Sequence, residues 1–293
     1  MAWFGATVPE ELCVIDPPTT DEVAQQYADW LDDCRPLAAR RFRQRFKDAR
    51  DDALVEAVTW WMLAGYFRYV VTSGEGDGGG PDFDCGDDHH PLLFTVEATA
   101  FRSEALSRVA DLPPEPVDFA GALGDVSQAL FDRVERKVRQ AKERSGSVLV
   151  VLGSTHWCHN MVLDRWAAEG LIAGRRKLSV PVGKPATEIE TVTAFEGSAF
   201  LRLQEHFGIE AARKALAGVL LLGINARGCC VIGSLNPWAT YPFDPALLPG
   251  IPLCTASLTP DQEVLNLSWV VGSPSPARLE FVRVPPPRSP RRP

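Results

Sequence analysis

The sequence lacks the features that place a protein in a membrane or in an oxidising compartment. No apolar run reaches the length needed to span a bilayer. The first twelve residues, MAWFGATVPEEL, do not show the basic segment followed by an apolar segment that marks a signal peptide. The seven cysteines are an odd number without a repeated spacing, which favours reduced thiols over a disulfide framework. We therefore expect a cytoplasmic protein with no membrane partner.

An excess of positive charge is also missing, because the formal net charge is −8 at pH 7. This balance counts against a surface that coats nucleic acid indiscriminately, although a phosphate backbone responds to local charge. Residues 35–50, RPLAARRFRQRFKDAR, form one local basic run. The run predicts either a solvated helix face or a nucleic-acid contact. Its candidate contact residues are Arg40, Arg41, Arg43, Arg45 and Lys47.

What the chain does have is the composition of an ordinary globular protein, with 45% apolar and 23% charged residues. A length of 293 residues is ample for a substantial core. No internal repeat is visible. We expect a helical region over residues 1–50, a core over 51–153, and an extension of that core or a small subdomain over 154–284. The Pro- and Arg-rich residues 285–293, PPPRSPRRP, predict a disordered tail.

Residues 67–101 organise the chain, because they predict three strands separated by a glycine-rich turn and an acidic turn. Alternate side chains of a strand point to opposite faces. In the last strand, one face carries Glu97 and the other is wholly apolar: Leu92, Phe94, Val96 and Ala98. The short strand before it carries Asp82, which would stand beside Glu97 if the two strands pair. Two carboxylates at a sheet edge suit a hard divalent cation such as Mg²⁺.

Helical patterns flank the three strands. Residues 51–66, DDALVEAVTWWMLAGY, precede them and carry Glu56 in mid-helix. A second amphipathic helix is predicted over residues 125–144, followed by a buried parallel strand over 147–153, SVLVVLG. The apolar stripe of that second helix is Leu130, Val134, Val138 and Ala141, whereas another face carries Arg133, Lys137, Gln140 and Arg144. The predicted order is helix, three strands, helix, strand.

In these residues the chain resembles the PD-(D/E)XK nuclease superfamily. Members place an aspartate after a proline on one strand and Asp/Glu-X-Lys on the next, as Pro81-Asp82 and Glu97-Ala98-Thr99 do here, except that Thr99 replaces the lysine. The order of elements over residues 51–153 is also that of the superfamily. The resemblance implies an α/β fold with a restriction-endonuclease-like core and a C-terminal α/β extension. It also implies hydrolysis of DNA with Mg²⁺, or with Mn²⁺ in its place.

The resemblance implies a role for each matching residue. Asp82 and Glu97 would hold the metal. Some members carry their lysine on the following helix, which makes Lys137 the candidate, and Gln140 would then position water or phosphate. Glu56 looks like the glutamate that many members carry before the first strand, although Glu56 and Lys137 also fit ordinary solvated helix faces. The pattern does not distinguish DNA from RNA as the partner, and it admits a homodimer that cuts both strands.

Three other interpretations compete with a hydrolase. The threonine at position 99 admits a nuclease fold that binds nucleic acid or a protein partner without cutting. Two groups of zinc-type ligands occur, Cys85 with His89-His90 and Cys158 with His156 and His159, but neither has finger-like spacing. If the strands through Glu97 and Val150 are parallel, these groups lie at opposite ends of the sheet. Nucleophilic catalysis by Ser154 or Cys158 lacks a G-x-S-x-G elbow.

The second half of the chain predicts structure but no chemistry. We expect helices over residues 159–170 and 196–217, a hairpin that turns through residues 225–228, and a strand over 263–271. Residues 102–122 are predicted to form a Pro-rich connection.

Overall fold

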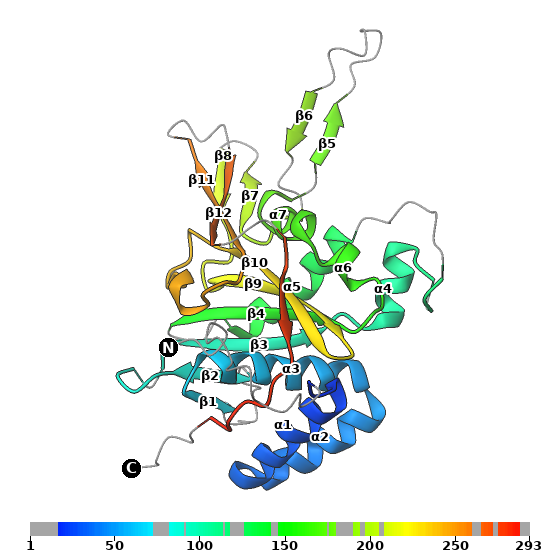
Figure 1. Ribbon diagram of the computed structural model, residues 1–293. Helices are drawn as coiled ribbons and strands as arrows, with labels where there is room; N and C mark the ends of the chain where they lie inside the picture. The colour runs from blue at the N-terminus through cyan, green and yellow to red at the C-terminus, as the bar shows by residue number, and fades with distance from the viewer. Residues whose placement is uncertain are drawn as a thin grey trace, which may run out of the picture.

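A computed structural model places the chain in the mixed α/β class (Figure 1), which confirms the predicted class. It describes residues 17–287 except for several short segments, namely 73–81, 91, 114, 118–125, 142–145, 175, 180–189, 194–196, 205–207, 260–264 and 272–274. Pro81, the glycine-rich turn and the last six residues of the predicted tail lie outside the described residues. No helix in the described part of the chain has the length and apolarity required to cross a membrane.

The described elements begin and end as follows. The helices are α1 (Thr20–Cys34), α2 (Pro36–Asp48), α3 (Arg50–Tyr66), α4 (Ser103–Ala110), α5 (Ser127–Ala141), α6 (His159–Val162), α7 (Arg165–Ala173) and the 3-10 turn η3 (Pro245–Leu247). The strands are β1 (Tyr69–Thr72), β2 (Phe83–Gly86), β3 (Phe94–Ala100), β4 (Ser147–Ser154), β5 (Arg176–Ser179), β6 (Glu190–Thr193), β7 (Leu201–Gln204), β8 (Gly208–Ala211), β9 (Gly218–Asn225), β10 (Gly228–Leu235), β11 (Leu253–Leu258), β12 (Leu265–Val271) and β13 (Ala277–Glu280).

One nine-stranded mixed sheet forms the centre of the molecule, with the order β1-β2-β3-β4-β9-β10-β11-β12 and with β13 paired to β10. Strands β1, β2 and β3 form an antiparallel meander. Strand β4 lies parallel to β3 and to β9, as a helical crossover between β3 and β4 requires. The predicted hairpin turning through residues 225–228 is confirmed, since β9 and β10 pair from Asn225 and Gly228 onward.

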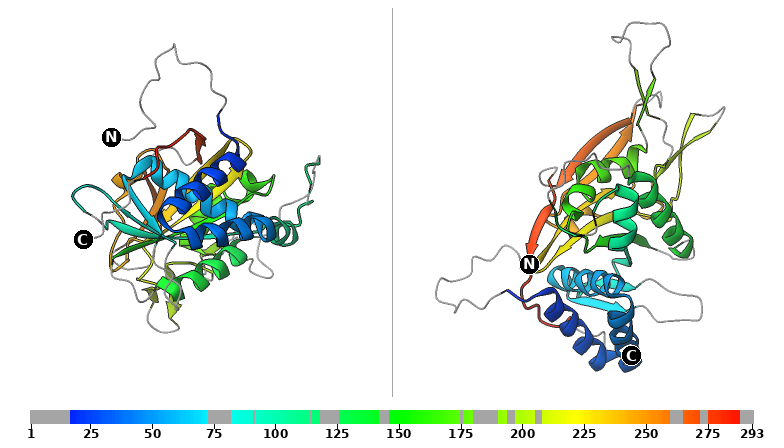
Figure 2. Two further views of the ribbon diagram at one scale, coloured as in Figure 1. Left: turned by 90° about the horizontal axis from the view of Figure 1, so that it is seen from below. Right: turned by 90° about the vertical axis from the view of Figure 1, so that its right-hand side faces the viewer.

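Two further pairs of strands lie outside this sheet. Strand β5 pairs with β6, and β7 pairs with β8, each in antiparallel register. The β5–β6 hairpin projects away from the body of the molecule beyond α7 (Figures 1 and 2).

The sheet has a hydrophobic core on each face, because successive side chains of its central strands point alternately to the helices on one face and to the helices on the other. On β4, Leu149 and Val151 face the core formed with α1, α2 and α3, whereas Val150 and Leu152 face the core formed with α4 to α7. A strand buried on both faces is apolar at nearly every position, as the sequence of β4 is. The chain is therefore a three-layer structure of helices, sheet and helices (Figure 2).

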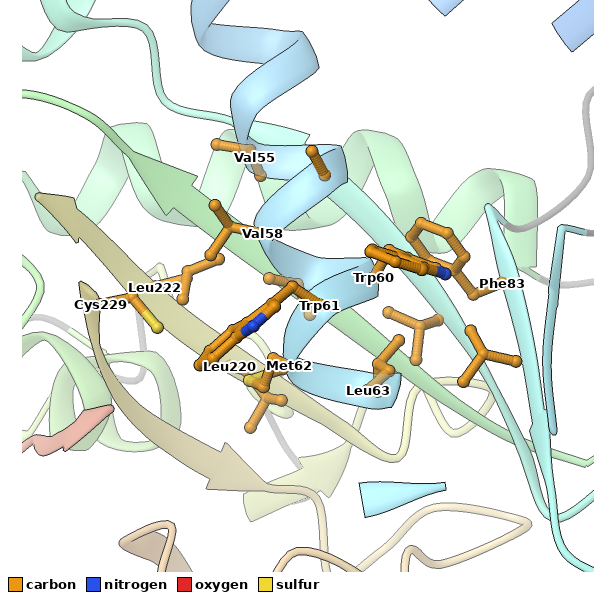
Figure 3. Close-up of a cluster of buried hydrophobic side chains, with 14 of the residues drawn as sticks. Val55, Val58, Trp60, Trp61, Met62, Leu63, Phe83, Leu220, Leu222 and Cys229 are labelled. Atoms are coloured by element: carbon orange, nitrogen blue, oxygen red, sulfur yellow. The ribbon is translucent and has the colours of Figure 1, made fainter. Parts of the chain in front are cut away.

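Helix α3 is buried on almost every side, which is expected of a helix that is apolar all round. Figure 3 shows Trp61 and Met62 on the side of Leu220 in the sheet, while Trp60 lies beside Phe83. The Trp60 ring also packs at a tilt against the ring of Tyr27 of α1, with centroids 5.4 Å apart. Gly153 of β4 permits the close approach of α3, because a β-carbon there would lie 2.7 Å from the Val55 methyl groups.

Two predictions about local structure are wrong. The range 196–217 was predicted as a helix, but its described part contains the β7–β8 hairpin. Arg202 and Glu210 form a cross-strand ion pair at 3.0 Å, and the Ser198 hydroxyl donates to the Ile172 carbonyl at 2.6 Å. These tertiary contacts outweigh the helix propensity of a segment rich in Glu, Ala and Leu.

The second error is in the Pro-rich range 102–122, which contains helix α4 rather than a plain connection. Leu106 and Ala110 of α4 are buried against the core, so a short amphipathic helix precedes the prolines. Leu92 was also assigned to the apolar face of the β3 strand, but it precedes β3 and is 50% exposed.

Candidate functional site

The pairing of β2 with β3 sets Asp82 beside Glu97. Phe83 pairs with Val96, so the next position of this antiparallel register places Asp82 opposite Glu97, just beyond the last paired residues. The Asp82 Oδ2 atom accepts a hydrogen bond of 2.7 Å from the backbone N–H of Ala98. This contact fixes the carboxylate where the ladder between the two strands ends. The predicted juxtaposition of Asp82 and Glu97 is observed.

Helix α5 brings Lys137 to the same point. Leu130, Val134 and Val138 are buried, which turns the next face of the helix towards the edge of β3. The Lys137 Nζ atom lies 2.9 Å from Glu97 Oε2, in an ion pair whose side chains are 23% and 4% exposed, respectively. The predicted approach of Lys137 to Glu97 is therefore confirmed. Thr99, two residues after Glu97 on β3, is half-buried and carries no charge.

Glu56 approaches the site from α3 on the other side of the sheet. It accepts a hydrogen bond of 2.8 Å from the Tyr27 hydroxyl and forms an ion pair of 2.6 Å with Arg45. Its side chain is 12% exposed, whereas that of Arg45 is 48% exposed. Carboxylates thus occupy the interior of the site, and the cations Arg45 and Lys137 occupy its outer side.

The charges of these residues are coupled. Burial raises the pKa of Asp82, and the positive charges of Lys137 and Arg45 with the Ala98 N–H partly oppose this rise. Burial also raises the pKa of Glu56, to which the negative charge of Asp82 adds, whereas Arg45 and Tyr27 act in the opposite direction. An added cation would stabilise the charged form of these two buried carboxyl groups.

The site can hold a divalent ion by the chemistry of its donors. Mg²⁺ in proteins is commonly bound by one or two carboxylates and completes its coordination with water and substrate phosphate, which Asp82 and Glu97 would permit. Within the described residues, no three His, Cys, Asp or Glu side chains are grouped so that they alone would ligate a metal. A metal at this edge would therefore depend on water and substrate for its other ligands.

Tyr27 is a member of the site that the sequence did not identify. It lies on the buried stripe of α1, is 1% exposed, and donates its hydroxyl to Glu56. Its pKa is raised well above the ordinary value by burial and then by Glu56. A buried tyrosine requires a polar partner, and Glu56 is the only carboxylate in the interior of the otherwise apolar stretch from Ala53 to Gly65. The lone carboxylate in an apolar helix was a signal available in the sequence, whereas the burial of Tyr27 against it was not.

The basic residues of α2 differ in their surroundings. Arg43 binds Asp32, with Nη1 3.0 Å from Oδ1, and Arg45 binds Glu56. Arg40, Arg41 and Lys47 are exposed on the same helix. Gln140 belongs to α5, but its side chain lies outside the described residues.

A second polar cluster lies where β4 ends. Asp51 accepts hydrogen bonds from the Thr155 hydroxyl at 2.6 Å and from the Ser103 N–H at 2.8 Å. His156 Nδ1 accepts the Cys158 N–H at 3.1 Å, so the proton of the neutral ring lies on Nε2, which faces Ser107 Oγ at 2.9 Å. The imidazole therefore donates to the serine and does not activate it.

The competing catalytic assignments find no support in this cluster. Burial raises the pKa of the Cys158 thiol, which disfavours the nucleophilic thiolate. The Ser154 hydroxyl is fully buried and accepts the His156 N–H at 3.2 Å. His89 and His90 precede β3 whereas His156 follows β4, and since these strands are parallel the two groups lie at opposite ends of the sheet, as expected.

Comparison of the chain with family models, curated proteins and solved structures found no match.

Proposed function

We propose that the chain is a metal-dependent endonuclease that hydrolyses phosphodiester bonds in DNA, built on a restriction-endonuclease-like core. The observation that supports this best is the ion pair of 2.9 Å between Lys137 and Glu97. A site that lacks a lysine two residues after its glutamate needs a cation from elsewhere to offset charge that develops at phosphorus. Lys137 supplies that cation from α5.

The order of elements also favours this core. Helix α3, the β1–β2–β3 meander, helix α5 and strand β4 follow one another, with α4 inserted between β3 and α5. Of the two candidate ligands, Asp82 directly precedes β2 and Glu97 lies on the adjacent strand β3, at the point where β2 begins.

Asp82 and Glu97 would hold Mg²⁺, or Mn²⁺ in its place. The ion, when bound, supplies positive charge to the scissile phosphate and lowers the pKa of a bound water. Lys137 Nζ has three hydrogens, of which one is directed to Glu97, so the others are available in principle for a water or a phosphate oxygen. In the hydrolysis, the water oxygen bonds to phosphorus, one P–O bond to a sugar breaks, and the leaving oxygen takes up a proton.

Glu56 and Arg45 would act on the substrate side of the site. Arg45 is held by Glu56 at 2.6 Å and is the most exposed charge of the group, so an approaching phosphate meets it before the buried carboxylates. Gln140 remains a candidate for positioning water or phosphate, because it follows Lys137 by three residues on α5.

A second candidate is a nuclease fold that binds nucleic acid or a protein partner without cutting. One observation favours it, namely that Lys137 already neutralises Glu97, and an ion pair of this kind needs no metal to be stable. The two candidates differ in whether DNA is cleaved when Mg²⁺ is supplied.

Cleavage of plasmid DNA tests the proposal. The purified chain should nick or cut DNA with Mg²⁺ or Mn²⁺ and stop when a chelator is added, with RNA assayed in parallel. Asp82→Asn and Glu97→Gln remove one charge each with little change of shape and should each reduce the rate by roughly 10²-fold or more. Cleavage in chelator, or full activity in either variant, would contradict the site. DNA binding without cleavage would favour the second candidate.

A further inference from the structure

Arg133 lies on α5 one helical turn before Lys137, and its guanidinium group is held in a fixed place. Its Nη1 atom donates to the Ala100 carbonyl at 2.6 Å, at the end of β3. The group also lies over the Phe101 ring, 4.9 Å from the centroid. The side chain is half-buried. A guanidinium presents five N–H donors in a rigid fork, so one bond to a carbonyl leaves most of its donors for another acceptor.

The surroundings of Arg133 are positive. Burial lowers its pKa, and the positive charges of Arg136 and Arg102 lower it further, whereas Asp52 acts in the opposite direction. Asp52 is itself bound to Arg102, whose Nε donates to Oδ2 at 3.0 Å. Among the described residues, no carboxylate forms an ion pair with Arg133. Asp51 and Glu104 also act on Arg102, whereas the carboxylate that acts on Arg133 is Asp52.

Arg213, which follows β8, shows what a structural arginine packed against the same helix looks like. It lies over the Phe131 ring at 4.5 Å and donates to the Ser198 carbonyl at 3.2 Å, as Arg133 does to Phe101 and Ala100. However, Arg213 also binds Glu135 of α5 at 3.2 Å. Arg213 is therefore paired with a carboxylate, whereas Arg133 forms no such ion pair within the part of the chain that the structure describes. A half-buried guanidinium without a directly bound carboxylate favours an anion from outside the chain.

The position of this charge relative to the candidate site suggests which anion. Four residues separate Arg133 from Lys137, a distance of about 6 Å along the helix axis. Successive phosphates of one DNA strand advance by about 3.4 Å along the duplex axis, so the two cations span one to two phosphates. Strand β3 runs beneath them from Glu97 to its end at Ala100, and Phe101 and Arg102 follow it.

We propose that Arg133, flanked by Arg102 and Arg136, binds a backbone phosphate of DNA next to the phosphate held at Glu97 and Lys137. This inference rests on the proposed function, because it assumes that the scissile phosphate lies at that edge. The substrate strand then runs along α5 and the end of β3. Recognition of a phosphate by guanidinium is independent of base sequence, so this contact positions the strand and does not select a sequence.

The salt dependence of DNA binding tests this contact in chelator, where no cleavage occurs. Each phosphate contact contributes about 0.9 to the slope of log K against log salt. Arg133→Gln should reduce the slope by about one unit and weaken binding several-fold between 50 and 200 mM salt. Arg133→Lys, which keeps the charge, should retain most of the slope. Arg213→Gln is the matched control and should bind as the native chain does.

The outcomes separate this inference from the hydrolase. An unchanged slope in Arg133→Gln, or an equal reduction in Arg213→Gln, would overturn the phosphate contact even if the native chain cuts DNA. A reduced slope only in Arg133→Gln would support it even if no condition yields cleavage. Inorganic phosphate and chloride should also be compared as competitors of DNA binding at equal ionic strength. If the site needs a polymer, phosphate should displace DNA no more strongly than chloride does. Displacement of DNA by low inorganic phosphate would overturn the assignment to a strand and indicate a site for the free ion.

Discussion

Two polar clusters, one around Asp51 and one around Asp82, lie at the two sides of the β3–β4 pair. They differ in how their buried carboxylates are stabilised. At the end of β4, each oxygen of Asp51 accepts a hydrogen bond, one from Thr155 and one from Ser103. At the edge of β3, burial raises the pKa of Asp82 and of Glu56, and the negative charge of Asp82 raises the pKa of Glu56 further. The first cluster joins α3, α4 and β4, whereas the second retains charge that the chain does not fully compensate. Uncompensated charge of this kind gathers at functional sites.

The largest effect that separates the clusters is expected at Lys137. Lys137→Ala removes the cation from Glu97 and should reduce DNA cleavage by roughly 10²- to 10³-fold, the usual loss when one charge-stabilising donor is removed. Binding of DNA in chelator should fall far less than cleavage, because the arginines remain. The rate of plasmid cleavage and the equilibrium binding constant are the two measurements.

A rescue experiment checks that the loss at Lys137 reflects the missing charge. Thr99→Lys added to Lys137→Ala returns a lysine to the strand that carries Glu97, and should recover part of the activity. Cleavage at the native rate in the single variant Lys137→Ala would remove Lys137 from the mechanism and leave the non-cutting interpretation.

The second prediction concerns the free energy of unfolding, which a substitution should lower in the Asp51 cluster but not in the Asp82 cluster. Asp51→Ala leaves the Thr155 hydroxyl and the Ser103 N–H without their acceptor, which should lower the free energy of unfolding by about 1–3 kcal/mol. Asp82→Asn removes a carboxylate whose burial is costly, and should leave stability unchanged or slightly raised at pH 7. Chemical denaturation measures both. A loss in Asp82→Asn as large as that in Asp51→Ala would show that Asp82 is a structural residue.

Activity supplies the control for that comparison. Asp51→Ala should keep its cleavage rate per folded molecule, whereas Asp82→Asn should not. Loss of cleavage in Asp51→Ala at a temperature where it is fully folded would contradict the separation of the two clusters.

The sequence predicted a contact correctly where the pattern within one helix or strand determines which side chains face the site. Lys137 was placed correctly because the apolar positions Leu130, Val134 and Val138 determine which face of α5 is buried, and so which face turns to β3. Asp82 and Glu97 were paired correctly because register follows from alternation along short antiparallel strands.

Prediction from the sequence failed where the structure depends on packing between elements that are distant in the chain. Tyr27 reaches Glu56 because α1 crosses α3, and no local pattern specifies that crossing. The β7–β8 hairpin was mistaken for a helix because its helix-forming residues are overruled by pairs such as Arg202 with Glu210. Arg45 was assigned to a general basic face, although one of its neighbours in space is the buried Glu56.

The smallest expected effect concerns pH at the edge of β3. Asp82 must be ionised to hold the metal and Glu56 must be ionised to hold Arg45, and because burial raises both pKa values, activity is lost as the pH falls through those values. Arg45 lowers both pKa values, so Arg45→Gln should move the acid limb of the cleavage profile, measured at limiting Mg²⁺, to higher pH. The shift should shrink in high salt, because Arg45 is 48% exposed and its charge is screened. Arg43→Gln on the same helix faces Asp32 instead and should leave the limb in place. Identical profiles in the native chain and both variants would show that neither Asp82 nor Glu56 limits the reaction at low pH.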